Sequence, residues 1–115
     1  MPYLKLHTNI SMTTEQTTQL LPQLSTCIAK ATGKPERYVM IELQENRAML
    51  FGGSNQPLAY LECKSIGLTS TQAKAISATV SELLKTTLQL AADRIYIEFS
   101  DCAPEFWGWN GSTFG

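Results

Sequence analysis

The sequence predicts an α+β fold: a two-layer sandwich in which two helices cover one face of a four-stranded mixed sheet. Strand and helix patterns alternate as strand, helix, strand, and the same order then occurs a second time. A weak repeat with an offset of 57 positions relates the two halves. Each helix is a long crossover, which predicts parallel, right-handed pairing of the strands that flank it. At 115 residues the chain is expected to form a single domain, 1–115.

The first strand is expected from Pro2 to Thr8, where polar and aromatic residues alternate with Leu4 and Leu6. Pro2 has two interpretations. A strand tolerates proline as its first residue, because that residue need not donate to the ladder. Proline is also small enough for Met1 to be removed from in front of it, which would leave a secondary amine that can act as a base.

The first helix is predicted to begin near Thr13, because Thr13 and Gln16 have the spacing of a capping box. Its end is indicated by Gly33, with Pro35 just beyond. Pro22 lies inside the helix and lacks an N–H donor, so we expect an interruption there, with a kink or a weak first half.

A second strand is expected from Tyr38 to Gln44. After a turn, the short apolar run from Ala48 to Phe51 is available to pair with another subunit. The breaker from Gly52 to Pro57 predicts a loop.

The second unit repeats this order. A strand is expected from Leu58 to Ser65, and a helix is expected from Thr69 because Gln72 completes another capping box. The last strand of the sheet is expected at 95–99. In the aromatic tail, Asn110-Gly111 predicts a two-residue hairpin turn.

The repeat aligns Pro2-Tyr3-Leu4 with Ala59-Tyr60-Leu61 and Arg37 with Arg94. With a one-residue gap, 40–43 falls over 96–99. The sheet face away from the helices would then hold several aromatic and apolar residues, namely Tyr3, Tyr38, Met40, Tyr60 and Tyr96. A closed homo-oligomer is expected to cover such a face.

Composition argues against several function classes. The net charge is −1 and no block of like charge occurs, so nucleic-acid or anionic-membrane binding is not expected. The three cysteines are widely spaced and are expected to be reduced thiols. No export signal or apolar run of membrane-spanning length is present, which favours a cytoplasmic protein, with non-classical secretion left open. No cofactor fingerprint or metal-ligand cluster is found, so neither a cofactor nor a metal is expected.

Several motifs together resemble one known family. They are Met1-Pro2 before a strand, the run 31–35 (ATGKP), the run 51–54 (FGGS), Ser65-Ile66-Gly67, the run 93–97 (DRIYI) and the run 108–114 (GWNGSTF). In this order and spacing they look like the macrophage migration inhibitory factor family of the tautomerase superfamily. The resemblance implies a homotrimer whose sheets line a central barrel, and a keto-enol tautomerase that uses the N-terminal proline.

The resemblance also implies a site shared between subunits. Its catalytic residues would be Pro2 and Lys34 of one chain and Tyr96 of the neighbour. The implied substrate-binding residues are Lys34, Ser65, Ile66, Tyr38, Glu98, Trp107, Trp109 and Phe114. Glu98 stands where animal members have Asn, and Trp107 where the family usually has a smaller apolar residue. The CxxC motif of some members aligns with 58–61, which lacks cysteine, so a thiol-disulfide oxidoreductase role is disfavoured.

The implied activity is that of an isomerase acting on phenylpyruvate-like aryl α-keto acids, phenylpyruvate or hydroxyphenylpyruvate first, with dopachrome as a further candidate. The alternative is a secreted, cytokine-like signalling protein in which the pocket is vestigial or weakly active and the receptor is unknown. Dehalogenase or decarboxylase chemistry would need more cations in the pocket than Lys34 supplies.

Overall fold

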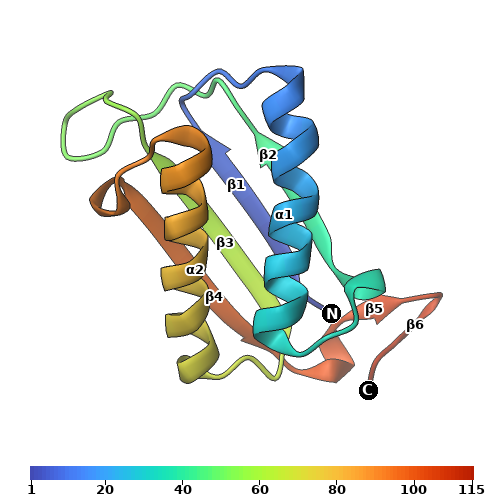
Figure 1. The fold of residues 1–115 in the computed structure, drawn as a ribbon. Coiled ribbons are helices and arrows are strands. Elements are labelled where there is room, and N and C mark those ends of the chain that lie inside the picture. The colour runs from blue at the N-terminus through green and yellow to red at the C-terminus, as the bar shows by residue number, and fades with distance from the viewer.

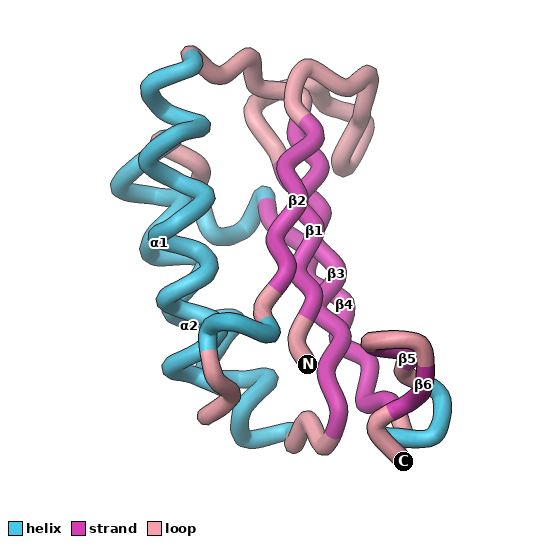
Figure 2. The backbone as a smooth tube through the Cα atoms, turned by 90° about the vertical axis from the view of Figure 1, so that its right-hand side faces the viewer, coloured by secondary structure: helices cyan, strands magenta, loops and turns pink.

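Two helices pack on one face of a four-stranded sheet, and a short aromatic tail lies at one end of the opposite face (Figures 1 and 2). The computed structural model describes residues 1–115. Its elements are β1 (Tyr3–Thr8), α1 (Thr14–Thr32), β2 (Met40–Gln44), β3 (Ala59–Ile66), α2 (Ser70–Leu88), β4 (Ile95–Cys102), β5 (Gly108–Trp109) and β6 (Ser112–Thr113). The predicted α+β sandwich is confirmed, including both helices on the same face.

The sheet has the order β2-β1-β3-β4, with parallel pairing inside each unit and antiparallel pairing of β1 with β3. Lys5 pairs with Glu62, its own equivalent in the repeat, so a pseudo-twofold axis passes between them. Because of this axis, β1 and β3 begin at opposite ends of the sheet.

The core lies between the helices and the sheet. Apolar side chains at alternate strand positions meet one stripe from each helix. Its fully buried members include Leu4, Leu6, Leu61 and Cys63 from the sheet, Leu20, Leu24 and Ile28 from α1, and Ile76, Val80 and Leu84 from α2.

Both predicted capping boxes are present: Thr13 with Gln16, and Thr69 with Gln72. Gly33 ends α1 at φ 70°, as expected for a C-cap glycine. The expected interruption at Pro22 was wrong, because α1 runs continuously through it. Pro22 is exposed, so water can satisfy the carbonyl that it leaves without a donor, while the buried face packs on both sides of it. Neither helix is long and apolar enough to cross a membrane.

The second strand begins later than predicted. Tyr38 ends a 3-10 turn (Glu36–Tyr38), closed by hydrogen bonds from the N–H of Tyr38 to the Pro35 carbonyl and from the N–H of Val39 to the Glu36 carbonyl. The corresponding turn before β4 is Ala92–Arg94, so Tyr38 is structurally equivalent to Arg94. The alignment of Arg37 with Arg94 was therefore displaced by one position, because the gap lies earlier in the chain.

Candidate active site

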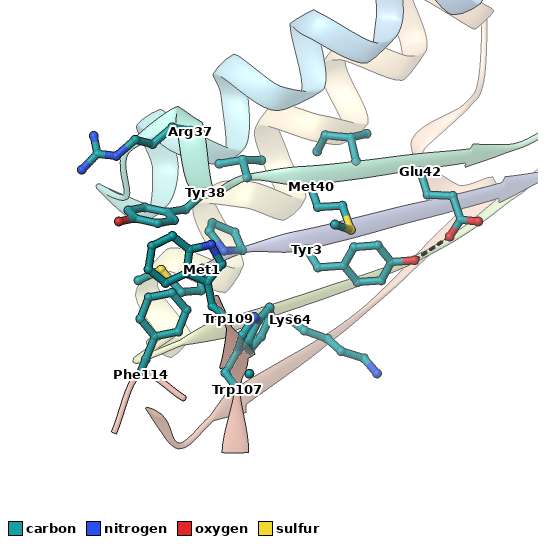
Figure 3. A pocket seen from close by; sticks show the side chains of 14 residues that line it. Met1, Tyr3, Arg37, Tyr38, Met40, Glu42, Lys64, Trp107, Trp109 and Phe114 are labelled. Carbon is teal, nitrogen blue, oxygen red and sulfur yellow. Dashed lines mark hydrogen bonds between the residues drawn. The ribbon is translucent and has the colours of Figure 1, made fainter. Parts of the chain in front are cut away.

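A cavity of about 790 Å³ opens at the end of the sheet where β1 begins (Figure 3). Four segments form it: the N-terminus with the start of β1, the turn that leads into β2 together with β2 itself, the end of β3, and the C-terminal tail. Of the predicted site residues, those that line it are Pro2, Tyr38, Trp107, Trp109 and Phe114.

Three aromatic rings form one wall of the cavity. Tyr38 meets Trp109 edge-on at 5.4 Å between ring centroids and meets Phe114 edge-on at 5.9 Å. The rings of Trp109 and Phe114 stack at 5.5 Å. The predicted hairpin turn at Asn110-Gly111, with φ 51° and 79°, brings these two tail residues side by side. Tyr38 therefore joins the tail to the body of the domain.

The N-terminus lies in the same cavity. Pro2 is buried, and its carbonyl accepts a hydrogen bond of 3.0 Å from the N–H of Met40. Burial lowers the pKa of the Met1 amino group below its usual value, and the positive charge of Lys34 lowers that pKa further. Lys34 follows the C-cap glycine of α1, so the end of this helix brings its charge to the N-terminus.

Other predicted residues lie outside the cavity lining. Lys34, Ser65 and Ile66 do not line it, although Ser65 and Ile66 end the strand that pairs with β1. Ser65 is 1% exposed, lies in phase with the core residues of β3, and its Oγ has no hydrogen-bond partner.

Tyr96 and Glu98 lie on β4, on the sheet face opposite the helices. Tyr96 pairs with Tyr60, which pairs with His7, five residues beyond Pro2 on β1. At about 3.4 Å per residue, this separation is about 17 Å along the strand. A site that contains both Pro2 and Tyr96 therefore requires side chains from two chains.

The cavity also contains residues that the sequence analysis missed, among them Tyr3, Arg37 and Lys64. The hydroxyl of Tyr3 donates to Oε1 of Glu42 at 2.6 Å, which raises the pKa of Tyr3 to about 12. The guanidinium of Arg37 lies over the ring of Tyr38 at 4.8 Å. Lys64 is the antiparallel partner of Tyr3, so only knowledge of the strand register could have placed it here. Arg37 and Lys64 thus add two positive charges to that of Lys34 near the cavity.

The fold and cavity define a class of protein: a domain of two β-α-β units whose pocket opens beside its own N-terminus. A family model described as macrophage migration inhibitory factor matches residues 1–115. The chain belongs to the macrophage migration inhibitory factor family, within the tautomerase superfamily.

Three similar proteins match nearly the whole chain. It is similar to macrophage migration inhibitory factor of Xenopus tropicalis, at 38% identity over 115 residues and 99% of each protein. It is also similar to the Brugia malayi homolog, at 40% identity over 116 residues and 100% of each. The crystal structure of a homologue from Prochlorococcus marinus has a TM-score of 0.92 at 39% identity, covering 98% of this chain and 99% of that one.

Proposed function

We propose that the protein is a keto-enol tautomerase of aryl α-keto acids such as phenylpyruvate and hydroxyphenylpyruvate, with Pro2 as the general base after removal of Met1. One observation carries this proposal: Pro2 lines an aromatic cavity in which the neighbouring terminal amino group has a lowered pKa. A base that works near neutral pH needs an amine that is partly unprotonated there.

Removal of Met1 would make the nitrogen of Pro2 the terminal amine in the same surroundings. Burial disfavours its charged form, and the positive charge of Lys34 acts in the same direction. Both causes that act on the Met1 amino group would therefore lower the pKa of the Pro2 amine.

In the proposed reaction, the Pro2 nitrogen takes a proton from the carbon between the ketone and the aryl ring. The C–H electron pair becomes the C=C bond of the enol, and the carbonyl π electrons move to oxygen. That oxygen takes a proton from the hydroxyl of Tyr96 on a neighbouring chain. In the reverse direction the protonated Pro2 returns a proton to carbon while the enol O–H returns its proton to the Tyr96 phenolate, which regenerates the ketone and both catalytic groups. Lys34 would attract the carboxylate, and the N–H of Ile66 would add a directed contact.

The aromatic wall supports an aryl substrate. Tyr38, Trp109 and Phe114 offer ring faces and edges to a flat ring, and Trp107 adds a further aromatic side chain to the lining. Because Pro2 and Tyr96 lie at opposite ends of one sheet, the working form would be an oligomer, and we propose a homotrimer.

The test combines intact mass with an ultraviolet assay of phenylpyruvate enol and ketone. We expect the intact mass to show loss of Met1 and the mass in solution to be that of a trimer. We expect tautomerase activity in the wild type and none in Pro2→Gly. Inserting one alanine ahead of Pro2 moves the amine without changing the cavity residues, and should also abolish activity. Full activity with Met1 retained, or with the inserted alanine, would falsify the proline-base mechanism.

A second candidate function is favoured by the relatives themselves, which are named for inhibition of macrophage migration. In this signalling role, saturable binding to a receptor ectodomain should survive Pro2→Gly. Loss of binding together with tautomerase activity would instead tie both properties to the cavity.

A further inference from the structure

We propose that Arg94 is a positioning residue for Tyr96: it fixes the loop 51–57, and through Phe51 of that loop it orients the phenol of Tyr96. The inference rests on the role proposed above for Tyr96. It concerns the end of the sheet opposite the Pro2 cavity, where β3 and β4 begin.

The side chain of Arg94 donates hydrogen bonds to four backbone carbonyls of one loop. Its Nη1 donates to the carbonyl of Phe51 at 2.7 Å, and its Nη2 donates to those of Ser54 at 3.0 Å and Gln56 at 2.9 Å. Its Nε donates to the carbonyl of Pro57 at 3.3 Å. A planar guanidinium presents its donors in a fixed fork, so these bonds define the path of the loop.

The loop also closes on itself. Backbone hydrogen bonds run in both directions between Phe51 and Ser54, at 3.0 and 3.1 Å. Gly52 and Gly53 between them have φ of 59° and 75°, a region that glycine enters without strain. The backbone of Phe51 is thus held both by this turn and by Arg94.

The ring of Phe51 connects Arg94 to Tyr96. The guanidinium carbon of Arg94 lies 5.1 Å from the centroid of the Phe51 ring. The centroids of the Phe51 and Tyr96 rings are 4.5 Å apart, and the two ring planes are tilted relative to each other. Arg94 immediately precedes β4 and Tyr96 is the second residue of β4, and Phe51 contacts both.

Tyr96 differs from the two other tyrosines on this face of the sheet. The hydroxyls of Tyr3 and Tyr60 donate to Glu42 and Glu62, at 2.6 and 2.9 Å. Tyr96 is 65% exposed, and its ring packs against the ring of Phe51. This arrangement restrains the ring of Tyr96 while leaving its hydroxyl available to a substrate oxygen.

The test compares Arg94→Lys and Phe51→Leu with a control at the other anchor of the loop. Asn9 donates to the carbonyl of Asn55 at 2.8 Å and accepts from the N–H of Leu58 at 3.0 Å. Asn9→Ala therefore loosens the same loop without removing a contact to Phe51. Phe51→Leu keeps the carbonyl contacts of Arg94, so it serves even if Arg94→Lys fails to fold.

The first readout does not need activity. With 3-fluorotyrosine incorporated, the ¹⁹F signal of Tyr96, assigned by its loss in Tyr96→Phe, should shift or broaden in Arg94→Lys and Phe51→Leu. It should stay unchanged in Asn9→Ala. An unchanged Tyr96 signal in both test variants would overturn the inference, whether or not the protein proves to be a tautomerase.

The second readout is a double-mutant cycle on kcat. Misplacement of a reacting group is costly, so Arg94→Lys and Phe51→Leu should each lower kcat about tenfold with KM little changed. In the Tyr96→Phe background neither change should lower kcat further, whereas additive losses would contradict a role through Tyr96. An unchanged kcat in Tyr96→Phe itself would refute the catalytic part of the inference, while Pro2→Gly separately tests the proline base.

Discussion

Replacement of Tyr38 by alanine should release the C-terminal tail from the cavity wall. The ring of Tyr38 makes edge-on contacts with Trp109 at 5.4 Å and Phe114 at 5.9 Å, and both would be lost. Aromatic pairs of this geometry contribute about 0.5–1.5 kcal/mol each beyond the area they bury, so docking of the tail should weaken by about 1–3 kcal/mol. The stacked pair of Trp109 and Phe114 lies within the tail and should survive.

Hydrogen exchange of a peptide that covers 103–115 measures this opening directly. A loss of about 1–3 kcal/mol corresponds to exchange that is about 5- to 150-fold faster through the open state. Both tryptophans of the chain lie in the tail, so acrylamide quenching of tryptophan fluorescence should increase in parallel. Tyr38→Phe keeps both ring contacts and is the matched control. Unchanged exchange in Tyr38→Ala, or an equal increase in Tyr38→Phe, would refute the idea that these contacts hold the tail.

Three further predictions concern the amine, the face of β4 and the helices. Lys34→Gln removes a positive charge that lowers the pKa of the terminal amine, so the acidic limb of the pH profile of kcat/KM should move to higher pH. Burial is the larger cause of the lowered pKa, so the amine pKa should stay below its usual value in this variant. Glu98, two residues after Tyr96 on β4, carries a carboxylate that would repel an acidic substrate. Glu98→Gln should therefore raise tautomerase activity, and an unchanged kcat/KM would show that Glu98 does not face the site. Thr69→Ala breaks the capping box of α2 and should lower the free energy of unfolding, measured in urea, by about 1 kcal/mol. Ser70→Ala, at an exposed position, is the control. If both variants lose equally little unfolding free energy, the cap does not stabilise the helix.

The fold was predictable because its signals are local and repeated. Both capping boxes, the C-cap glycine and the Asn110-Gly111 turn act through neighbours in sequence, and all of them appear in the structure. The interruption predicted at Pro22 was wrong because a local rule ignores burial: an exposed proline can remain within a helix whose other face is packed.

The site was less predictable because it depends on register and on distant segments. Resemblance to a family indicated Pro2, Tyr38 and the tail aromatics, which do meet in one cavity. Lys64 and Tyr3 become neighbours only through antiparallel pairing, and no periodicity within either strand reveals that. Tyr96 could be recognised by its motif, but only the strand order shows how far it lies from Pro2.

The pseudo-twofold axis explains why one chain has two unlike ends. Tyr38 and Arg94 are equivalent residues, each ending the 3-10 turn before the second strand of its unit, and each anchors a segment against its own end of the sheet. Tyr38 holds the tail beside Pro2, and Arg94 holds the loop of Phe51 beside Tyr96. The equivalent of Pro2 is Ala59, the first residue of β3, whose nitrogen is in a peptide bond with Leu58 and is therefore not a free amine. Only the first end can therefore supply the proposed proline base, while the second presents the exposed phenol of Tyr96. The proposed site needs both ends and would form only where copies of the chain meet. Changes at Tyr38 and Arg94 should therefore affect the proposed reaction from opposite sides of a subunit boundary.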